Sequence, residues 1–230
     1  MTGAGFWRRY AAWSLDAALL AAPSVLPCWP LLRAAADALA RDYPALLEVA
    51  GRSLGDALRD GTPLAAVATQ WLADPALRAG ADALAQSLLA LLWPPLLVFA
   101  VLGAAWHVAF ETSARQATPG QRLLGLRVAD TAGARIGRTR ALLRHAAGAL
   151  SWLTLNIGHA LVLLRPDRRA LHDLVAGTVV VQDADPRAKL PPLAQAWLGL
   201  QLLALWWGVV AWFGVTSDAL QRGLDAAFGL

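Results

Sequence analysis

The feature that most constrains this chain is its first apolar segment, which runs from about Tyr10 to about Trp29 and carries Asp16 inside it. Its length matches the roughly 20 residues that an α-helix needs to cross the hydrocarbon core of a membrane. A carboxylate within such a helix costs free energy unless a partner or a watery cavity compensates its charge. A later part of the chain must therefore supply the partner of Asp16.

The composition is typical of a membrane protein that crosses the bilayer several times. The 230 residues are 57% hydrophobic and only 16% charged, whereas a soluble domain has about 25% charged residues. Two further apolar segments, at about 84–110 and 193–215, are each long enough for one span. Cys28 is the single cysteine, which excludes an internal disulfide and a cysteine metal cluster.

The positive charges lie between the apolar segments and are densest between Glu111 and Arg144. Arginines in this position follow the positive-inside rule, which places this segment and the N-terminus in the cytoplasm. That rule accounts for the net charge of +4, so we expect the lipid bilayer as a partner and no nucleic acid. A homo-oligomer is compatible with the sequence.

Residues 30–83 have a different character, because charges recur every few residues among Ala and Leu at helical spacing. Gly51 and the stretch Gly61-Thr62-Pro63 punctuate the pattern. This predicts two to four short amphipathic helices on or beside the membrane. A loosely packed soluble insertion is the alternative.

Two short segments favour β-structure. Residues 126–130 alternate in polarity, and residues 177–182 are rich in β-branched side chains. If they pair, both lie on the cytoplasmic side. The apolar stretch 141–164 between them then forms a re-entrant or interfacial helical hairpin; a simple fourth span is the alternative, and it leaves the later arginines outside.

These observations predict an all-α polytopic membrane protein with three full transmembrane helices plus the helical hairpin (or four spans), and a short cytoplasmic β-hairpin. We divide the chain into a first transmembrane helix (1–29), an amphipathic insertion (30–83), a core (84–182) and a final part (183–230). The core holds the second span, the arginine-rich loop, the hairpin and a strand. The final part holds a linker, the last transmembrane helix and a tail.

Three stretches together resemble the RDD family of bacterial membrane proteins, named for one arginine and two aspartates. Arg9, Asp16 and Asp173 match those residues, and the stretch Thr118-Pro119-Gly120-Gln121-Arg122 is similar to the family's T-P-G-x-R loop. The resemblance covers about 5–26 and 96–182. It implies a location in the bacterial cytoplasmic (inner) membrane and a role in transport of an ion or a small ligand.

The two aspartates each allow two interpretations. Asp16 is either part of a structural pair or a site for an ion or proton. Asp173 is either a second carboxylate that shares a cation or proton with Asp16, or an aspartate that stabilises a turn by binding backbone amides. Two carboxylates brought close together raise the pKa of one of them, as a proton-coupled site requires.

Arg9 lies about 10 Å from Asp16 along the helix axis, too far for a direct bond. We therefore expect partners on other elements: Arg9 with Asp173 or Glu111, and Asp16 with Arg144 or His145. The remaining candidates form two groups. Glu111, His172 and Arg144 support the ion or ligand site. In the loop, Thr118, Pro119 and Gly120 form a turn, and Arg122 and Arg127 beyond it bind anionic lipid headgroups.

Two functions follow. In the first, the chain transports or binds a small cation, a proton or another small ligand through Arg9, Asp16 and Asp173. In the second, it is a non-transporting membrane scaffold or docking module in which these residues are structural. Enzymatic function is not expected, because the sequence has no phosphate-binding loop, no His-Glu-x-x-His and no Gly-x-Ser-x-Gly pattern. No metal and no cofactor are predicted.

Overall fold

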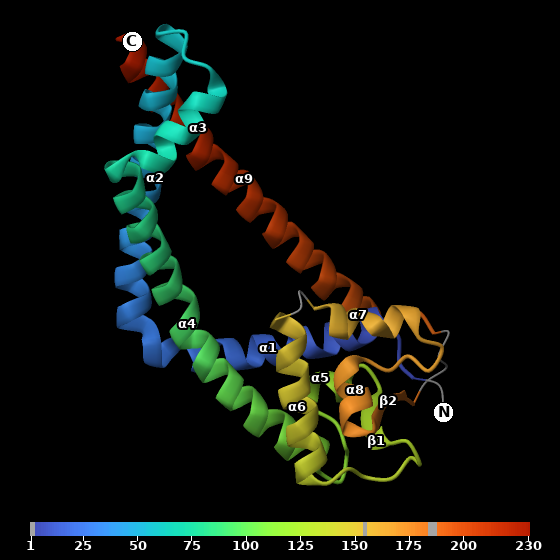
Figure 1. Cartoon of the computed structure of the whole chain (residues 1–230). Helices are drawn as coiled ribbons and strands as arrows, with labels where there is room; N and C mark the ends of the chain where they lie inside the picture. Colours follow the sequence, from blue (N-terminus) through green and yellow to red (C-terminus); the bar gives the residue numbers. More distant parts are fainter. Residues whose placement is uncertain (1–2, 154–155, 184–187) are drawn as a thin grey trace. The chain divides into compact units, whose positions relative to one another are not determined.

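The computed structural model describes residues 3–153, 156–183 and 188–230, and in this part the chain is mainly helical (Figure 1). Two strands form the sheet. The elements in chain order are α1 (Phe6–Val25), the 3-10 turn η1 (Leu26–Cys28), α2 (Trp29–Arg59), α3 (Leu64–Ala73), α4 (Pro75–Glu111), α5 (Pro119–Leu123), β1 (Leu126–Asp130), α6 (Arg138–Leu153), α7 (Ile157–Leu164), α8 (Leu171–Ala176), β2 (Thr178–Gln182) and α9 (Pro192–Phe228).

Three helical stretches are long and apolar enough to cross a membrane, as predicted. They are Phe6–Arg59, Pro75–Glu111 and Pro192–Phe228. The last two have 37 residues each, or about 55 Å of helix, against about 30 Å of hydrocarbon in a bilayer. Both helices therefore extend beyond the apolar segments from which they were predicted, and the expected C-terminal tail is helical as far as Phe228.

The chain divides into two compact units. Unit 1 comprises Met1–Leu26 and Leu96–Gln201, and unit 2 comprises Pro27–Pro95 and Leu202–Leu230. Within α4 the boundary coincides with Pro94 and Pro95, each of which removes one backbone hydrogen bond from the helix. The stretches that resemble the RDD family, 5–26 and 96–182, lie inside unit 1.

Unit 1 is built around the predicted strand pair. β1 and β2 are antiparallel, with Val128 opposite Val180, so the expected pairing is confirmed. The N-terminal segment joins β2, since the Ala4 amide donates to the Val180 carbonyl at 2.9 Å. Val128, Val180 and the first turns of α1 share one apolar core, and Figure 1 shows α5, α6 and α8 gathered beside it.

This pairing decides between the two topologies for the segment from β1 to β2. The segment leaves and returns to one sheet, so it crosses the membrane an even number of times or not at all. Two crossings need two helices of about 20 residues, whereas α6 has 16 residues and α7 has eight. As far as the structure describes it, the segment is therefore a helical hairpin, and a simple fourth span does not fit the pairing of β1 with β2.

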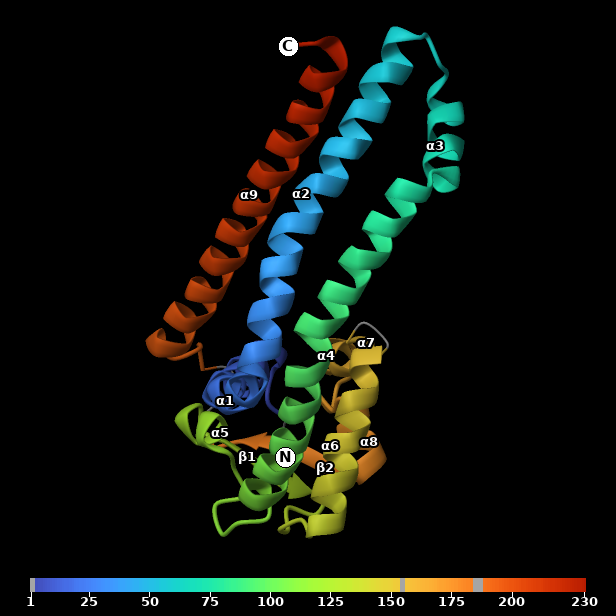
Figure 2. The same cartoon turned by 90° about the vertical axis from the view of Figure 1, so that its left-hand side faces the viewer.

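Unit 2 differs from the prediction of short helices, because α2 continues for 31 residues. Gly51, which the sequence pattern indicated as a helix break, lies inside α2, where this helix approaches α9 closely. A Cβ on Gly51 would lie 2.5 Å from the Leu220 carbonyl oxygen, and one on Gly223 would lie 2.3 Å from the Glu48 carbonyl oxygen. Small residues four positions apart on a helix, such as Gly51 and Gly55, permit such close helix contacts. Figure 1 and Figure 2 both show the C-terminal part of α9 beside the C-terminal part of α2.

We predict that Gly223→Ala destabilises unit 2 by about 1–3 kcal/mol, because its methyl group would overlap the backbone of α2. Gly214→Ala on the same helix is the matched control, since no heavy atom lies within 4 Å of its Cβ position. The control gains helix propensity and should be as stable as the parent or slightly more so. Thermal unfolding of the purified proteins in detergent tests both; equal melting temperatures for the two variants would contradict the packing.

Candidate functional site

The centre of unit 1 is a buried ion pair between Asp173 of α8 and two arginines. Arg9 of α1 donates from Nη1 to Asp173 Oδ2 at 2.6 Å, and Arg144 of α6 donates from Nη1 to Asp173 Oδ1. The Asp173 carboxylate is fully buried and also accepts from the Ala170 amide at 3.0 Å. One carboxylate therefore connects three helices.

A second carboxylate completes this network. Glu111, at the end of α4, is buried, and its Oε2 lies 3.3 Å from Nε of Arg144. Its Oε1 accepts from Gln121 at 3.2 Å and lies 3.2 Å from Nδ1 of His107. Burial lowers the pKa of the Arg144 guanidinium, and the charge of Glu111 acts in the opposite direction. Two arginines and two carboxylates thus balance one another.

Asp16 lies in a different environment, where its three hydrogen-bond donors are neutral. Its Oδ2 accepts from the Thr118 hydroxyl at 2.5 Å, and its Oδ1 accepts from the Gly120 amide at 2.9 Å and from the Trp106 indole at 3.3 Å. Its relative exposure is 1%. Among the ion pairs of the described residues, none includes Asp16.

The Thr-Pro-Gly stretch forms the turn that holds Asp16. Thr118 caps α5 by accepting from the Gln121 amide, and the Gln121 side chain accepts from the Thr118 amide in return. Pro119 is the first residue of the helix, where its missing N–H costs nothing. Gly120 lies against α1, since a Cβ there would be 2.1 Å from the Ala12 carbonyl oxygen. The motif therefore docks α5 on α1.

The structure brings together some of the predicted pairs. Arg9 pairs with Asp173, one of its two expected partners. The expected pairing of Asp16 with Arg144 or His145 is wrong: Arg144 binds Asp173 and Glu111, and Asp16 accepts from Thr118 of the turn and from Trp106. His172 lies beside Asp173, with Nε2 at 3.6 Å from Oδ1. In the part of the chain that is described, Asp16 and Asp173 share no hydrogen-bond donor.

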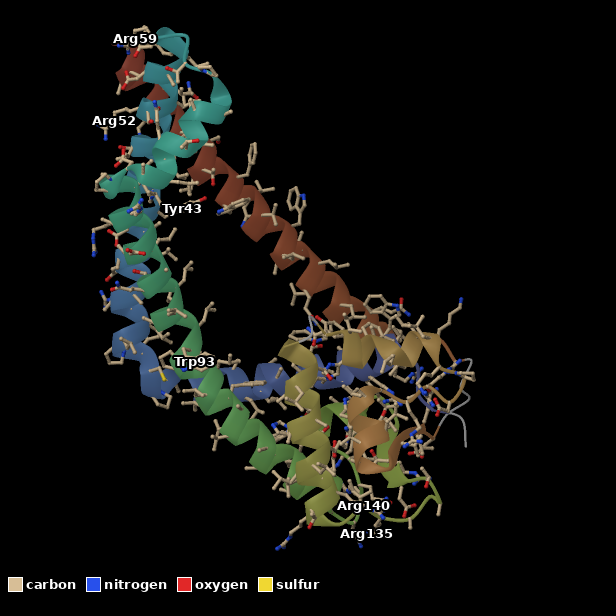
Figure 3. The ribbon with its side chains drawn as sticks, viewed as in Figure 1. Tyr43, Arg52, Arg59, Trp93, Arg135 and Arg140 are labelled. Carbon is tan, nitrogen blue, oxygen red and sulfur yellow. The ribbon has the colours of Figure 1, made fainter. Side chains whose placement is uncertain are left out.

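The loop arginines have partners within the protein. Arg122 donates to the Ala117 carbonyl at 2.9 Å and lies over the Phe110 ring, and Arg127 pairs with Asp183 at 3.1 Å. Figure 3 shows Arg135 and Arg140 near the beginning of α6, where both are exposed. The exposed basic surface of unit 1 therefore includes residues beyond the two that we selected from the sequence.

Sequence reasoning missed the role of Arg8. Its guanidinium is buried and donates to three backbone carbonyls, those of Leu124 at 3.2 Å, Ala188 at 3.0 Å and Lys189 at 2.8 Å. Adjacent residues on a helix point about 100° apart, so Arg8 and Arg9 lie on different sides of α1. The carbonyl partners themselves follow no sequence pattern.

Comparison with models of known protein families shows to which family the chain belongs. The model of the RDD family matches residues 3–177, well over half of the chain. The chain belongs to the RDD family. Searches of curated proteins and of solved structures gave no match. The RDD match includes the Arg9–Asp173 pair and the Asp16 turn, and α9 lies outside it. The chain is thus an RDD-family protein that passes through the membrane several times.

The docking of the Thr-Pro-Gly turn leads to a prediction. Gly120→Ala should destabilise this RDD protein by about 1–3 kcal/mol, because the added methyl group overlaps the Ala12 carbonyl and displaces the donors of Asp16. Gly137→Ala, with no heavy atom within 4 Å of its Cβ position, is the control. Thermal unfolding in detergent measures the difference. A melting temperature for Gly120→Ala equal to that of the control would refute the close contact.

Proposed function

We propose that this RDD-family protein carries a proton or a small cation across the bacterial cytoplasmic membrane, with Asp16 as the exchanging carboxylate. The observation that carries the proposal is the burial of the Asp16 carboxylate among neutral hydrogen-bond donors. This carboxylate is buried in an apolar helix and its donors in the described structure are the neutral groups of Thr118, Gly120 and Trp106. Binding a proton or a cation there would remove the energetic cost of an unpaired charge.

The proposal assigns a different role to the other two residues of the motif. Asp173 is already neutralised by Arg9 and Arg144, so a cation at Asp173 would have to displace a guanidinium. The network of Arg9, Arg144, Asp173 and Glu111 instead acts as a frame. It positions α1, and with α1 the carboxylate of Asp16. No catalytic role is assigned to any residue.

The proposed orientation places the N-terminus and the sheet in the cytoplasm. Several arginines of unit 1 lie in the connections between its helices, and the exposed Arg140 lies in the first turn of α6; those in the connections are Arg115, Arg135, Arg165, Arg168 and Arg169. Cations in such short connections favour the cytoplasmic side. We also infer that Arg122 and Arg127 face the anionic headgroups of that leaflet.

A second function is favoured by the fact that both oxygens of Asp16 already accept hydrogen bonds. On this reading all three motif residues are structural, and the chain is a non-transporting membrane module that presents its loops or unit 2 to a partner. The two candidates differ in what neutral substitutions of the aspartates do.

We expect Asp16→Asn to abolish proton or cation flux in proteoliposomes while leaving the melting temperature close to that of the parent. The amide keeps an acceptor for the Gly120 N–H but cannot exchange a proton. Asp173→Asn should instead lower the stability by about 3–5 kcal/mol, because it leaves the buried guanidinium of Arg9 without its carboxylate and that of Arg144 with Glu111 alone. A pH-sensitive dye inside the liposomes reports the proton flux that follows an imposed proton gradient, or that is coupled to an imposed Na⁺ or K⁺ gradient.

Equal flux from the parent and Asp16→Asn would exclude Asp16 as the exchanging group. Parent proteoliposomes that pass no more ions than empty liposomes, together with a loss of stability in both variants, would support the structural module.

The orientation is tested by cysteine labelling, because Cys28 is the only native cysteine. In a Cys28→Ser background, Asp183→Cys should react with a membrane-impermeant maleimide only after the cells are opened. Leu230→Cys should react in intact spheroplasts, since α9 begins in unit 1 and is long enough to cross. Labelling of Asp183→Cys from outside would reverse the proposed topology.

A further inference from the structure

Histidines surround the ion network in two pairs that sequence spacing did not predict. His107 of α4 and His145 of α6 have ring centroids 5.5 Å apart, and His159 of α7 and His172 of α8 have theirs 5.1 Å apart. The first pair has a carboxylate beside it, because His107 lies 3.2 Å from Glu111. The second pair has a different surrounding.

The rings of His159 and His172 lie over Gly148 of α6, whose missing side chain leaves room for them. A Cβ on Gly148 would lie 3.9 Å from Nδ1 of His172 and 4.0 Å from Nε2 of His159. In the described part of the chain, Nδ1 of both rings is buried without a hydrogen-bond partner. Each ring therefore has one buried nitrogen that forms no hydrogen bond with any described residue.

The charged groups that face this pair are mainly cations. The charge of Arg144 on α6 acts on both rings, and the charges of Arg9 on α1 and His107 on α4 act on His172. The one carboxylate beside His172 is its neighbour Asp173, at 3.6 Å from Nε2, and both arginines already bind it. A proton on either ring thus adds a positive charge to a site where the available negative charge is already balanced.

We propose that the His159–His172 pair is an acid-sensitive contact, which holds α7 and α8 together while both rings are neutral and releases them when either ring is protonated. Release of α8 moves Asp173, and the ion pair with Arg9 and Arg144 opens with it. This inference goes beyond the proposed carrier function and does not depend on it. The pair works as a proton-binding site that regulates the RDD core.

The direction of the pH dependence follows from the same contacts. Burial, followed by the charge of Arg144, lowers the pKa of His172 well below its usual 6.5, and the same two causes lower the pKa of His159. The unfolded chain therefore binds protons more readily than the folded hairpin does. The stability that the neutral pair contributes is complete above pH 6.5 and is lost as the pH falls below this value.

Hydrogen–deuterium exchange of the full-length protein in nanodiscs of neutral phospholipid tests the proposal. After correction for intrinsic rates, the protection of α7 and α8 should fall between pH 8 and pH 5, by about tenfold for each pH unit by which a folded-state pKa is lowered. His159→Gln combined with His172→Gln should remove most of this response. His159→Phe with His172→Phe is a second variant that keeps an aromatic pair in place and binds no proton.

His145→Gln is the matched control. Its ring pairs with that of His107 and not with His159 or His172, so the acid response of α7 and α8 should remain as in the parent. Unchanged protection of the parent from pH 8 to pH 5 would overturn the proposal. An acid response of parental size in the substituted proteins would overturn it as well.

Discussion

The structure of unit 1 depends on a single buried carboxylate, that of Asp173. Its partners Arg9 and Arg144 come from α1 and α6, while Asp173 itself lies in the first turn of α8. Loss of one partner from a buried ion pair costs about 3–5 kcal/mol, because it leaves the other charge unpaired in a medium of low dielectric constant. The pair therefore makes the relative placement of three helices specific, which apolar packing alone does to a lesser degree.

The position of α1 connects this ion pair to the rest of the unit. Asp16, seven residues after Arg9, holds the Thr118 turn and the Trp106 indole. Ser14, between them, accepts from Trp197 of α9 at 2.9 Å. One helix thus presents an arginine to the hairpin, an aspartate to α5 and α4, and a hydroxyl to the last helix. Arg9 and Asp16 are the charged members of this set of contacts, and both belong to the RDD motif.

Much of this arrangement could be predicted from the sequence, for identifiable reasons. Long apolar runs and β-branched runs are local signals, so the three long helices and the strand pair followed from them. The cost of a buried charge predicted a cross-helix partner for Arg9, and Asp173 is that partner. Contacts between neutral groups gave no such signal. The docking of Gly120 on Ala12 and of Gly223 on Glu48 depends on the absence of a side chain, which sequence reasoning interprets equally well as a turn or a helix break.

The contrast between the two aspartates limits how the motif works. A charge that is already paired changes little when an ion approaches, because the approaching ion must compete with a guanidinium held at 2.6 Å. A charge held by a hydroxyl, an amide and an indole has no such competitor, and for this reason we propose Asp16 as the exchanging carboxylate. Arg9 and Asp173 are consequently suited to keep unit 1 in one conformation. Asp16, held in place by that conformation, is the residue to which we assign the exchange of a proton or a small cation.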